Sequence, residues 1–378
     1  MTNTLAYVSK SVRTFTNNLA NVTLSNQEGN FYFSPPSLFL LLGTIYQGAS
    51  GNVAKVLKSV LNAVDPSTSL EDGVALVESL NPLGDVTFFQ SSTIFVREIT
   101  DVVSEFSKKA DGFGSSVQQA FERKGHADRK INAWIEQQTK GKMTHIVGHQ
   151  DYDEHTTGML VTACYWKVDW LEKSSFYECK KDVFFVSEEE KVKCQMLRMV
   201  CHIKYSERKD IDSYVMEMPY KVADCSLMIF LPVTGTSLKN LESKLFKRDF
   251  GVIHEELNPC LAVVLLPKIK MENTFNFRDA FTRMGLGDLF NGCGQFPGIF
   301  ETSEFNAKGF IHKVTIETGD QGSIVIEDTA TDYVTKGYMS TTSSHNKIAF
   351  TANRPYIFCV CYHKSCFIPL VVGRVERP

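Results

Sequence analysis

The order of hydrophobic patterns along the chain constrains its fold more than any other feature of the sequence. Helical spacing dominates the first 150 residues and begins with an N-terminal segment that repeats apolar side chains at Leu5, Val8, Val12 and Phe15. Four later runs are typical of strands and occupy residues 159–170, 213–220, 225–235 and 261–270. Helices followed by mostly antiparallel strands predict an α+β fold. No linker, repeat or change of composition divides the chain, so we expect one domain over residues 1–378.

Two helices in this pattern have recognisable ends. The segment NAWIEQQTKGKM predicts a helix that begins on Asn132 and closes at Gly141, because asparagine favours helix starts and glycine favours helix ends. The segment NTFNFRDAFTRMG predicts a second helix that stops at Gly285.

Composition excludes several classes of protein. The net charge of −3 gives no reason to expect binding to nucleic acid or to an anionic membrane. No apolar run reaches the length of a membrane span. The N-terminus lacks the apolar core and the small-residue cleavage site of a signal peptide, so we expect a cytoplasmic protein or one exported by a non-classical route.

Cysteine and histidine spacing predicts neither disulfides nor a metal site. The ten cysteines follow no framework, and several lie inside apolar runs, where a free thiol behaves as a small buried hydrophobe. The spacing of His145 and His149 can bind metal on a helix, but Gly148 breaks such a helix, and His155 lies in a turn-like segment. We therefore expect ordinary loop histidines, no metal and no cofactor.

The sequence also lacks the common catalytic signatures. It contains no GxSxG elbow, no phosphate-binding P-loop and no GxGxxG after a strand, so no catalytic residues are predicted and the chain is not expected to be an enzyme. A different feature is prominent near residues 319–344, where a strand-like apolar start passes into a long polar stretch.

Seven segments match, in order, motifs that occur together in one protein family. They are NFYFSPPSLFLLLGTIYQGASGN, NAWIEQQTKGKM, LVTACYWKVDW, MEMPYKVADCSLMIFLP, LLPKIKMENTFNFRDAFTRMGLGDLF, FIHKVTIE and PYIFCVCYHKSCFIPLVVGRVERP. The chain resembles a serpin, of the intracellular or parasite-like type without a classical signal peptide. The resemblance covers essentially the whole chain, and the joint match is highly specific.

The resemblance implies a serpin fold with three β-sheets, eight or nine helices and an exposed reactive-centre loop at about residues 320–350. It also implies a suicide-substrate mechanism, in which a serine protease cuts the loop and forms an acyl-enzyme. The cut loop then enters the central sheet as a new strand and distorts the trapped protease. The implied partner is a target serine protease, held covalently by a monomeric inhibitor.

Carrying the family spacing over residue by residue gives the reactive bond and the hinge. The hinge residues are Asp320, Gly322 and Ser323, and the bond cut is Lys336–Gly337. A lysine at this position suits trypsin-like proteases, whose primary pocket carries an acidic group.

The same resemblance places a group of residues that control opening of the central sheet. Ser34, Ser37 and His312 match the family's polar cluster, and Trp170 matches its tryptophan near the insertion point. Thr162 replaces an asparagine of the motif, and its shorter side chain is expected to loosen the cluster.

Two further departures leave alternatives open. Glu327 and its neighbours replace an alanine-rich hinge, which is expected to slow insertion and favours a non-inhibitory serpin, such as a chaperone or binding protein, as the second interpretation. The loop region is also about eight residues longer than the family pattern, which leaves Tyr338 or Met339 as second choices for the recognised residue, with chymotrypsin-like or elastase-like targets. A hydrolase is a distant third. Residues 65–80 are acidic, so no heparin activation is expected.

Overall fold

The computed structural model describes residues 2–24, 27–83, 88–97, 100–121, 126–170, 176–301, 305–318 and 348–378. Within these ranges it contains nine α-helices, among which the long first helix confirms the amphipathic N-terminal pattern. They are α1 (Thr2–Leu24), α2 (Pro35–Tyr46), α3 (Gly51–Val60), α4 (Pro66–Leu80), α6 (Ser104–Gly112), α7 (Ala127–Gln138), α8 (Leu238–Leu245), α9 (Phe250–Glu255) and α10 (Arg278–Phe281). None of the described helices is both long and apolar enough to cross a membrane.

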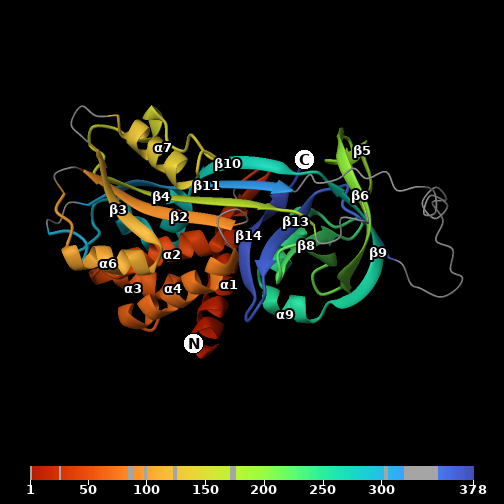
Figure 1. Ribbon diagram of the computed structural model, residues 1–378, viewed down its shortest axis with the longest axis horizontal. Helices are drawn as coiled ribbons and strands as arrows, with labels where there is room; N and C mark the ends of the chain where they lie inside the picture. Colours follow the sequence, from red (N-terminus) through yellow and green to blue (C-terminus); the bar gives the residue numbers. More distant parts are fainter. Residues whose placement is uncertain are drawn as a thin grey trace, which may run out of the picture.

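A five-stranded sheet runs through the helical half of the molecule (Figure 1). Its order is β10 (Lys270–Asn276), β11 (Ala307–Thr318), β4 (Gly158–Val168), β2 (Phe88–Arg97) and β3 (Ser115–Phe121). The outer pair β10–β11 and the pair β2–β4 are antiparallel, whereas β4 and β11 at the centre are parallel. Parallel neighbours need a long crossover between them, and here β4 and β11 are separated by more than a hundred residues of sequence.

The other strands form one continuous nine-stranded sheet, in which the long strand β6 (Lys191–Arg208) joins two groups of strands. In the first group, residues 191–199 of β6 pair with β5 (Phe176–Phe185) and residues 196–205 pair with β9 (Asn258–Pro267), and β9 in turn pairs with β12 (Ile348–Thr351). The last five residues of β6 pair with β7 (Ser213–Pro219), which begins the second group. That group continues through β8 (Cys225–Pro232), β13 (Tyr356–Tyr362), β14 (Ile368–Val375) and β1 (Phe31–Phe33). These two groups and the five-stranded sheet correspond to the three sheets expected, so the predicted α+β fold is confirmed.

Strand β4 separates two hydrophobic clusters, because successive side chains point to opposite faces of a sheet. Leu160, Cys164 and Trp166 join the main core, which includes the fully buried helix α2. The intervening residues, such as Val161, join a smaller cluster beneath Trp134 of α7. The central sheet therefore lies between α7 on one face and α2 with its neighbouring helices on the other (Figure 1).

The structure corrects two of the predicted helix starts. Helix α7 begins at Ala127, five residues before the expected start, and Asn132 lies inside the helix rather than at its cap. The Asn132 side chain instead accepts hydrogen bonds from the backbone amides of Ile146 and Val147, which return alongside the helix. The segment from Asn273 to Asn276 is the end of β10 rather than a helix, since it pairs with β11, although Gly285 does stop the helical turn that follows, with φ of 91°.

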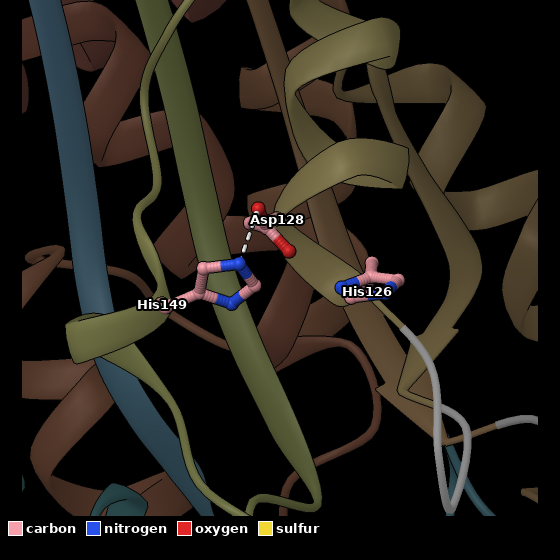
Figure 2. A group of neighbouring side chains, drawn as sticks. All are labelled: His126, Asp128 and His149. Carbon is pink, nitrogen blue, oxygen red and sulfur yellow. Dashed lines mark ion pairs between the residues drawn. The ribbon is translucent and has the colours of Figure 1, made fainter.

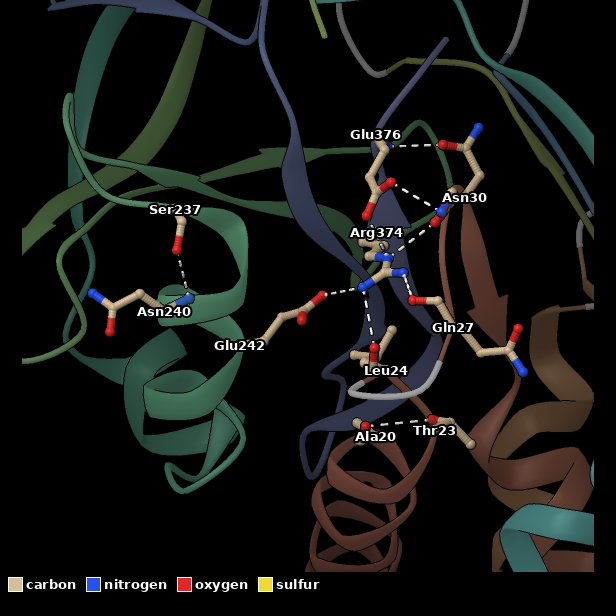
Figure 3. Close-up of polar contacts among 11 residues, drawn as sticks. Ala20, Thr23, Leu24, Gln27, Asn30, Ser237, Asn240, Glu242, Arg374 and Glu376 are labelled. Carbon is tan, nitrogen blue, oxygen red and sulfur yellow. Dashed lines mark hydrogen bonds and ion pairs between the residues drawn. The ribbon is translucent and has the colours of Figure 1, made fainter. Parts of the chain in front are cut away.

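A buried arginine ties the C-terminal strand to three other parts of the chain (Figure 3). The Arg374 guanidinium on β14 donates to the carboxylate of Glu242 on α8 at 2.9 Å and to the carbonyl of Leu24 at the end of α1 at 3.3 Å. It also donates to the carbonyls of Gln27 and Gly29. Burial raises the pKa of Glu242, whereas the hydrogen bond and the charge of Arg374 act to lower it. The buried Glu242 carboxylate therefore depends on Arg374 for its stabilisation.

We predict that Arg374→Met will lower the free energy of unfolding by about 3–5 kcal/mol, because it leaves the Glu242 carboxylate buried without a partner. Arg377→Met is the matched control, since Arg377 pairs with Glu190 at the surface and should contribute less than about 1 kcal/mol. Urea unfolding of both variants gives the comparison. Equal losses for the two variants would show that the buried pair has no special weight.

Candidate functional site

The candidate site is a polar cluster at the centre of the five-stranded sheet, where β4 and β11 pair. His312 on β11 lies directly opposite Thr162 on β4 in the strand register. Ser34 and Ser37, at the start of α2, meet them from the core side, and all four residues are buried. The structure therefore brings together four of the five predicted control residues.

The hydrogen bonds define the protonation state of His312. The backbone N–H of Ser34 donates to His312 Nε2 at 2.9 Å, so this nitrogen acts as an acceptor and carries no proton. The neutral ring then holds its proton on Nδ1, which lies 2.5 Å from Thr162 Oγ1 and donates to it. The shorter side chain of Thr162 thus still reaches the histidine, and the expected loosening is not seen at this contact.

The cluster also reaches the next strand of the sheet. Ser37 Oγ lies 2.9 Å from Ser34 Oγ and 3.2 Å from Gln90 Oε1 on β2. Ser34 stands at the N-cap position of α2, but its side chain makes no capping hydrogen bond and serves the cluster instead. One helix start is therefore connected to β2 and β11 directly, and to β4 through His312.

Burial lowers the pKa of His312 to about 3. The geometry gives the same direction, because a proton on Nε2 would face the N–H of Ser34 and remove a hydrogen bond. His312 is therefore neutral at physiological pH, and the interface between β4 and β11 contains a group that resists protonation.

Trp170 lies apart from the cluster. It lies just beyond the end of β4 at Val168 and forms an isolated bridge with Tyr220. Its ring stacks on Tyr220 with 4.7 Å between centroids and 9° between planes. Its indole N–H is buried and has no hydrogen-bond acceptor among the described residues.

The predicted hinge and reactive bond fall on residues 319–347, which lie outside the described residues. The residues concerned are Asp320, Gly322, Ser323, Glu327, Lys336, Gly337, Tyr338 and Met339. The structure does define both ends of this segment. It leaves the carboxyl end of β11 at Thr318 and re-enters at Ile348, where β12 joins a different sheet.

Sequence reasoning missed Lys313, which faces away from the polar cluster toward α7. This lysine is buried, forms an ion pair with Glu272 on β10 at 2.5 Å and donates to the carbonyl of His145. It fastens the segment after α7 to β11. Its position next to His312 in an alternating strand was the available signal, because alternation places it on the opposite face.

We predict that acid will destabilise the folded chain through His312. Its pKa is about 3 when folded and about 6.5 when unfolded, so between these values only the unfolded chain takes up the proton. The free energy of unfolding should then fall by about 1.4 kcal/mol per pH unit as the pH drops below about 6.5, and level off below about 3.

Urea unfolding between pH 7 and pH 5 tests this. The His312→Gln variant should lose this part of the pH dependence, whereas His155→Gln, which removes an exposed histidine, should keep it. Identical pH slopes for the wild type and His312→Gln would contradict the assignment of a neutral buried ring.

Known proteins match this chain over nearly its whole length. The family model described as "Serpin (serine protease inhibitor)" matches residues 10–378. Human Serpin B3 is 26% identical over 93% of this chain and 95% of its own sequence. Leukocyte elastase inhibitor from Bos taurus is 26% identical over 94% of this chain and 95% of its own.

Solved structures agree in fold. Serpin48 of the insect Tenebrio molitor superposes with a TM-score of 0.83, covering 98% of each chain at 24% identity. Uncleaved ovalbumin superposes with a TM-score of 0.81, covering 98% of this chain and 100% of its own at 19% identity. With the family model matching almost all of its residues, the chain belongs to the serpin family.

Proposed function

We propose that this chain is a suicide-substrate inhibitor of serine proteases and that its targets are trypsin-like. The observation that carries the proposal is the parallel pair β4–β11 at the centre of the sheet, from whose end the segment 319–347 leaves. Inhibitors named for their targets, such as leukocyte elastase inhibitor, are among the relatives of this chain.

The topology favours insertion once the segment is cut. A strand that follows β11 and folds back runs antiparallel to β11, and therefore also antiparallel to β4. Insertion would replace one parallel ladder by two antiparallel ladders, and parallel pairing is slightly the less stable of the two. It would also give backbone hydrogen bonds to a segment that otherwise has water as its partner. Insertion of the reactive loop into a sheet is the recognised behaviour of serpins.

The polar cluster opposes insertion before the cut. The His312–Thr162 hydrogen bond crosses the β4–β11 interface and must break for the two strands to separate. A buried donor or acceptor left without a partner costs about 1–3 kcal/mol. The cluster therefore acts as a latch on the sheet, while the neighbouring Ser34 and Ser37 keep their own contacts with each other.

Glu327 supports a second candidate, a non-inhibitory serpin. If Ser323 enters the sheet facing the core, strand alternation sends Glu327 to the same face. An unpaired carboxylate there would cost on the order of several kcal/mol. Slower insertion would give the protease time to hydrolyse the acyl link, and the chain would then be a substrate.

The cysteines and the basic residues near α8 bear on where the chain acts and on whether heparin activates it. All ten cysteines are free thiols, which suits a reducing compartment, and we propose a cytoplasmic or non-classically exported protein. Two basic residues near α8 already have acidic partners, Lys244 with Asp212 and Arg248 with Asp210, so we propose no heparin activation there. The chain is proposed to act as a single-domain monomer and not as an enzyme.

Incubation with trypsin followed by a denaturing gel and mass spectrometry tests the proposal. We expect a covalent complex and release of a C-terminal peptide of 42 residues (378 − 336) that begins at Gly337. Lys336→Ala should abolish inhibition of trypsin-like enzymes, and Lys347→Ala is the matched control because it removes a lysine from the far end of the same segment.

The pattern of products separates the alternatives. The same incubation with chymotrypsin or elastase covers the second choices: a covalent complex and a peptide that begins at Met339 or Ser340 would move the recognised residue to Tyr338 or Met339 and the target class to chymotrypsin-like or elastase-like proteases. Clean cleavage at Lys336 without a covalent complex would contradict the inhibitory proposal and favour the non-inhibitory one.

A further inference from the structure

Three side chains with metal-binding atoms converge at the N-terminal end of α7 (Figure 2). His126 directly precedes α7, Asp128 lies in its first turn, and His149 lies in the short turn at His149–Asp151. One potential ligand atom from each lies within 4.8 Å of the other two. The structure thus groups His149 with His126 and Asp128, whereas the sequence predicted ordinary loop histidines and no metal site.

A tyrosine orients two of these groups. The Tyr152 hydroxyl donates to Asp128 Oδ1 at 2.7 Å, so its oxygen is left to accept a hydrogen bond from His149 Nδ1, 3.0 Å away. His149 Nε2 faces the second oxygen of Asp128, Oδ2, at 3.5 Å, and in the neutral ring its lone pair is available to a metal. Histidine ligands of metals usually donate their other ring N–H to a second group in this way.

The turn that carries His149 is anchored to α7. Asn132 of α7 accepts from the amides of Ile146 and Val147 at 2.8 and 3.1 Å and donates to the carbonyl of Val147 at 2.8 Å. The Gly148 amide donates to Asp151 Oδ2 at 2.8 Å and closes the turn. The three candidate ligands are therefore brought together by an ordered backbone.

We propose that His126, Asp128 and His149 bind a divalent transition metal of the zinc class, with water as the fourth ligand. Imidazole nitrogen and carboxylate oxygen lie about 2.0–2.1 Å from zinc, which puts neighbouring ligand atoms of a tetrahedron about 3.4 Å apart. The pair His149 and Asp128 already has this spacing at 3.5 Å. His126 is exposed, so rotation of its side chain can close the remaining gap. Calcium and magnesium prefer sites made wholly of oxygen and should not compete.

The position of the site gives it a mechanical consequence. A bound metal would join the first turn of α7 to the segment that leads from α7 into β4. Both pack on the face of β4 and β11 that bears the smaller hydrophobic cluster. The metal would fix the first turn of α7 against the segment that leads into β4. Any effect on sheet opening rests on the proposed inhibitory function, whereas metal binding itself does not.

Isothermal titration calorimetry of the untagged full-length chain with zinc chloride tests the site. The background should carry Cys179→Ser and Cys293→Ser, because these two cysteines are exposed and thiolates bind zinc. We expect one zinc per chain, with binding weakened more than about tenfold by His126→Ala or His149→Ala and about 10- to 100-fold by Tyr152→Phe. His155→Ala, which removes an exposed histidine of the same segment, should bind as the background does.

Hydrogen exchange provides a readout that does not depend on protease inhibition. Zinc should slow amide exchange in residues 126–152 of the background protein and leave exchange in the His149→Ala variant unchanged. Equal zinc affinity in the background and both histidine variants would overturn the proposal. So would the absence of zinc uptake, which would leave His149 and Asp128 as a simple surface ion pair.

Discussion

Strands β4 and β11 pair in a parallel ladder at the centre of the five-stranded sheet, although more than a hundred residues of sequence separate them. Ten register partners run from Gly158 with Ala307 to Val168 with Thr318. On one face lies the buried polar cluster around His312, and on the other lies α7 with the segment that follows it. Contacts on both faces would have to change if the two strands separated, and the proposed function depends on this one parallel interface.

The two faces restrain the interface by different physical means. On the core side, a neutral imidazole uses both of its nitrogens, one to accept from the backbone of Ser34 and one to donate to Thr162. On the α7 side, Lys313 binds Glu272 and the carbonyl of His145, so the segment after α7 is fastened to β11 by a buried charge. The interface is therefore held by a neutral hydrogen-bonded cluster on one face and by a charged lysine on the other, and the proposed function makes these two contacts its controls.

The sequence predicted the architecture well, because the change from helical to strand spacing is visible over long segments. It placed Ser34, Ser37 and His312 together only through the family motifs, since periodicity alone cannot pair β11 with β4. Local signals failed where side chains serve tertiary contacts. Asn132 looks like a helix cap but binds a returning segment, and the residues before Phe277 form a strand because β11 offers them a ladder. His126 and His149 come close because the chain returns alongside α7, and their spacing in the sequence does not predict this.

Thermal unfolding after cleavage is the most direct test of the role given to this interface. A chain cut by trypsin at Lys336, with the cut verified by mass, should be compared with the intact chain by scanning calorimetry. If the freed segment enters between β4 and β11, the midpoint should rise by tens of degrees, whereas a change of 1 kcal/mol in a chain of 378 residues shifts it by only about 1 °C. An unchanged melting curve after complete cleavage would contradict the account, because the parallel interface would then have stayed closed.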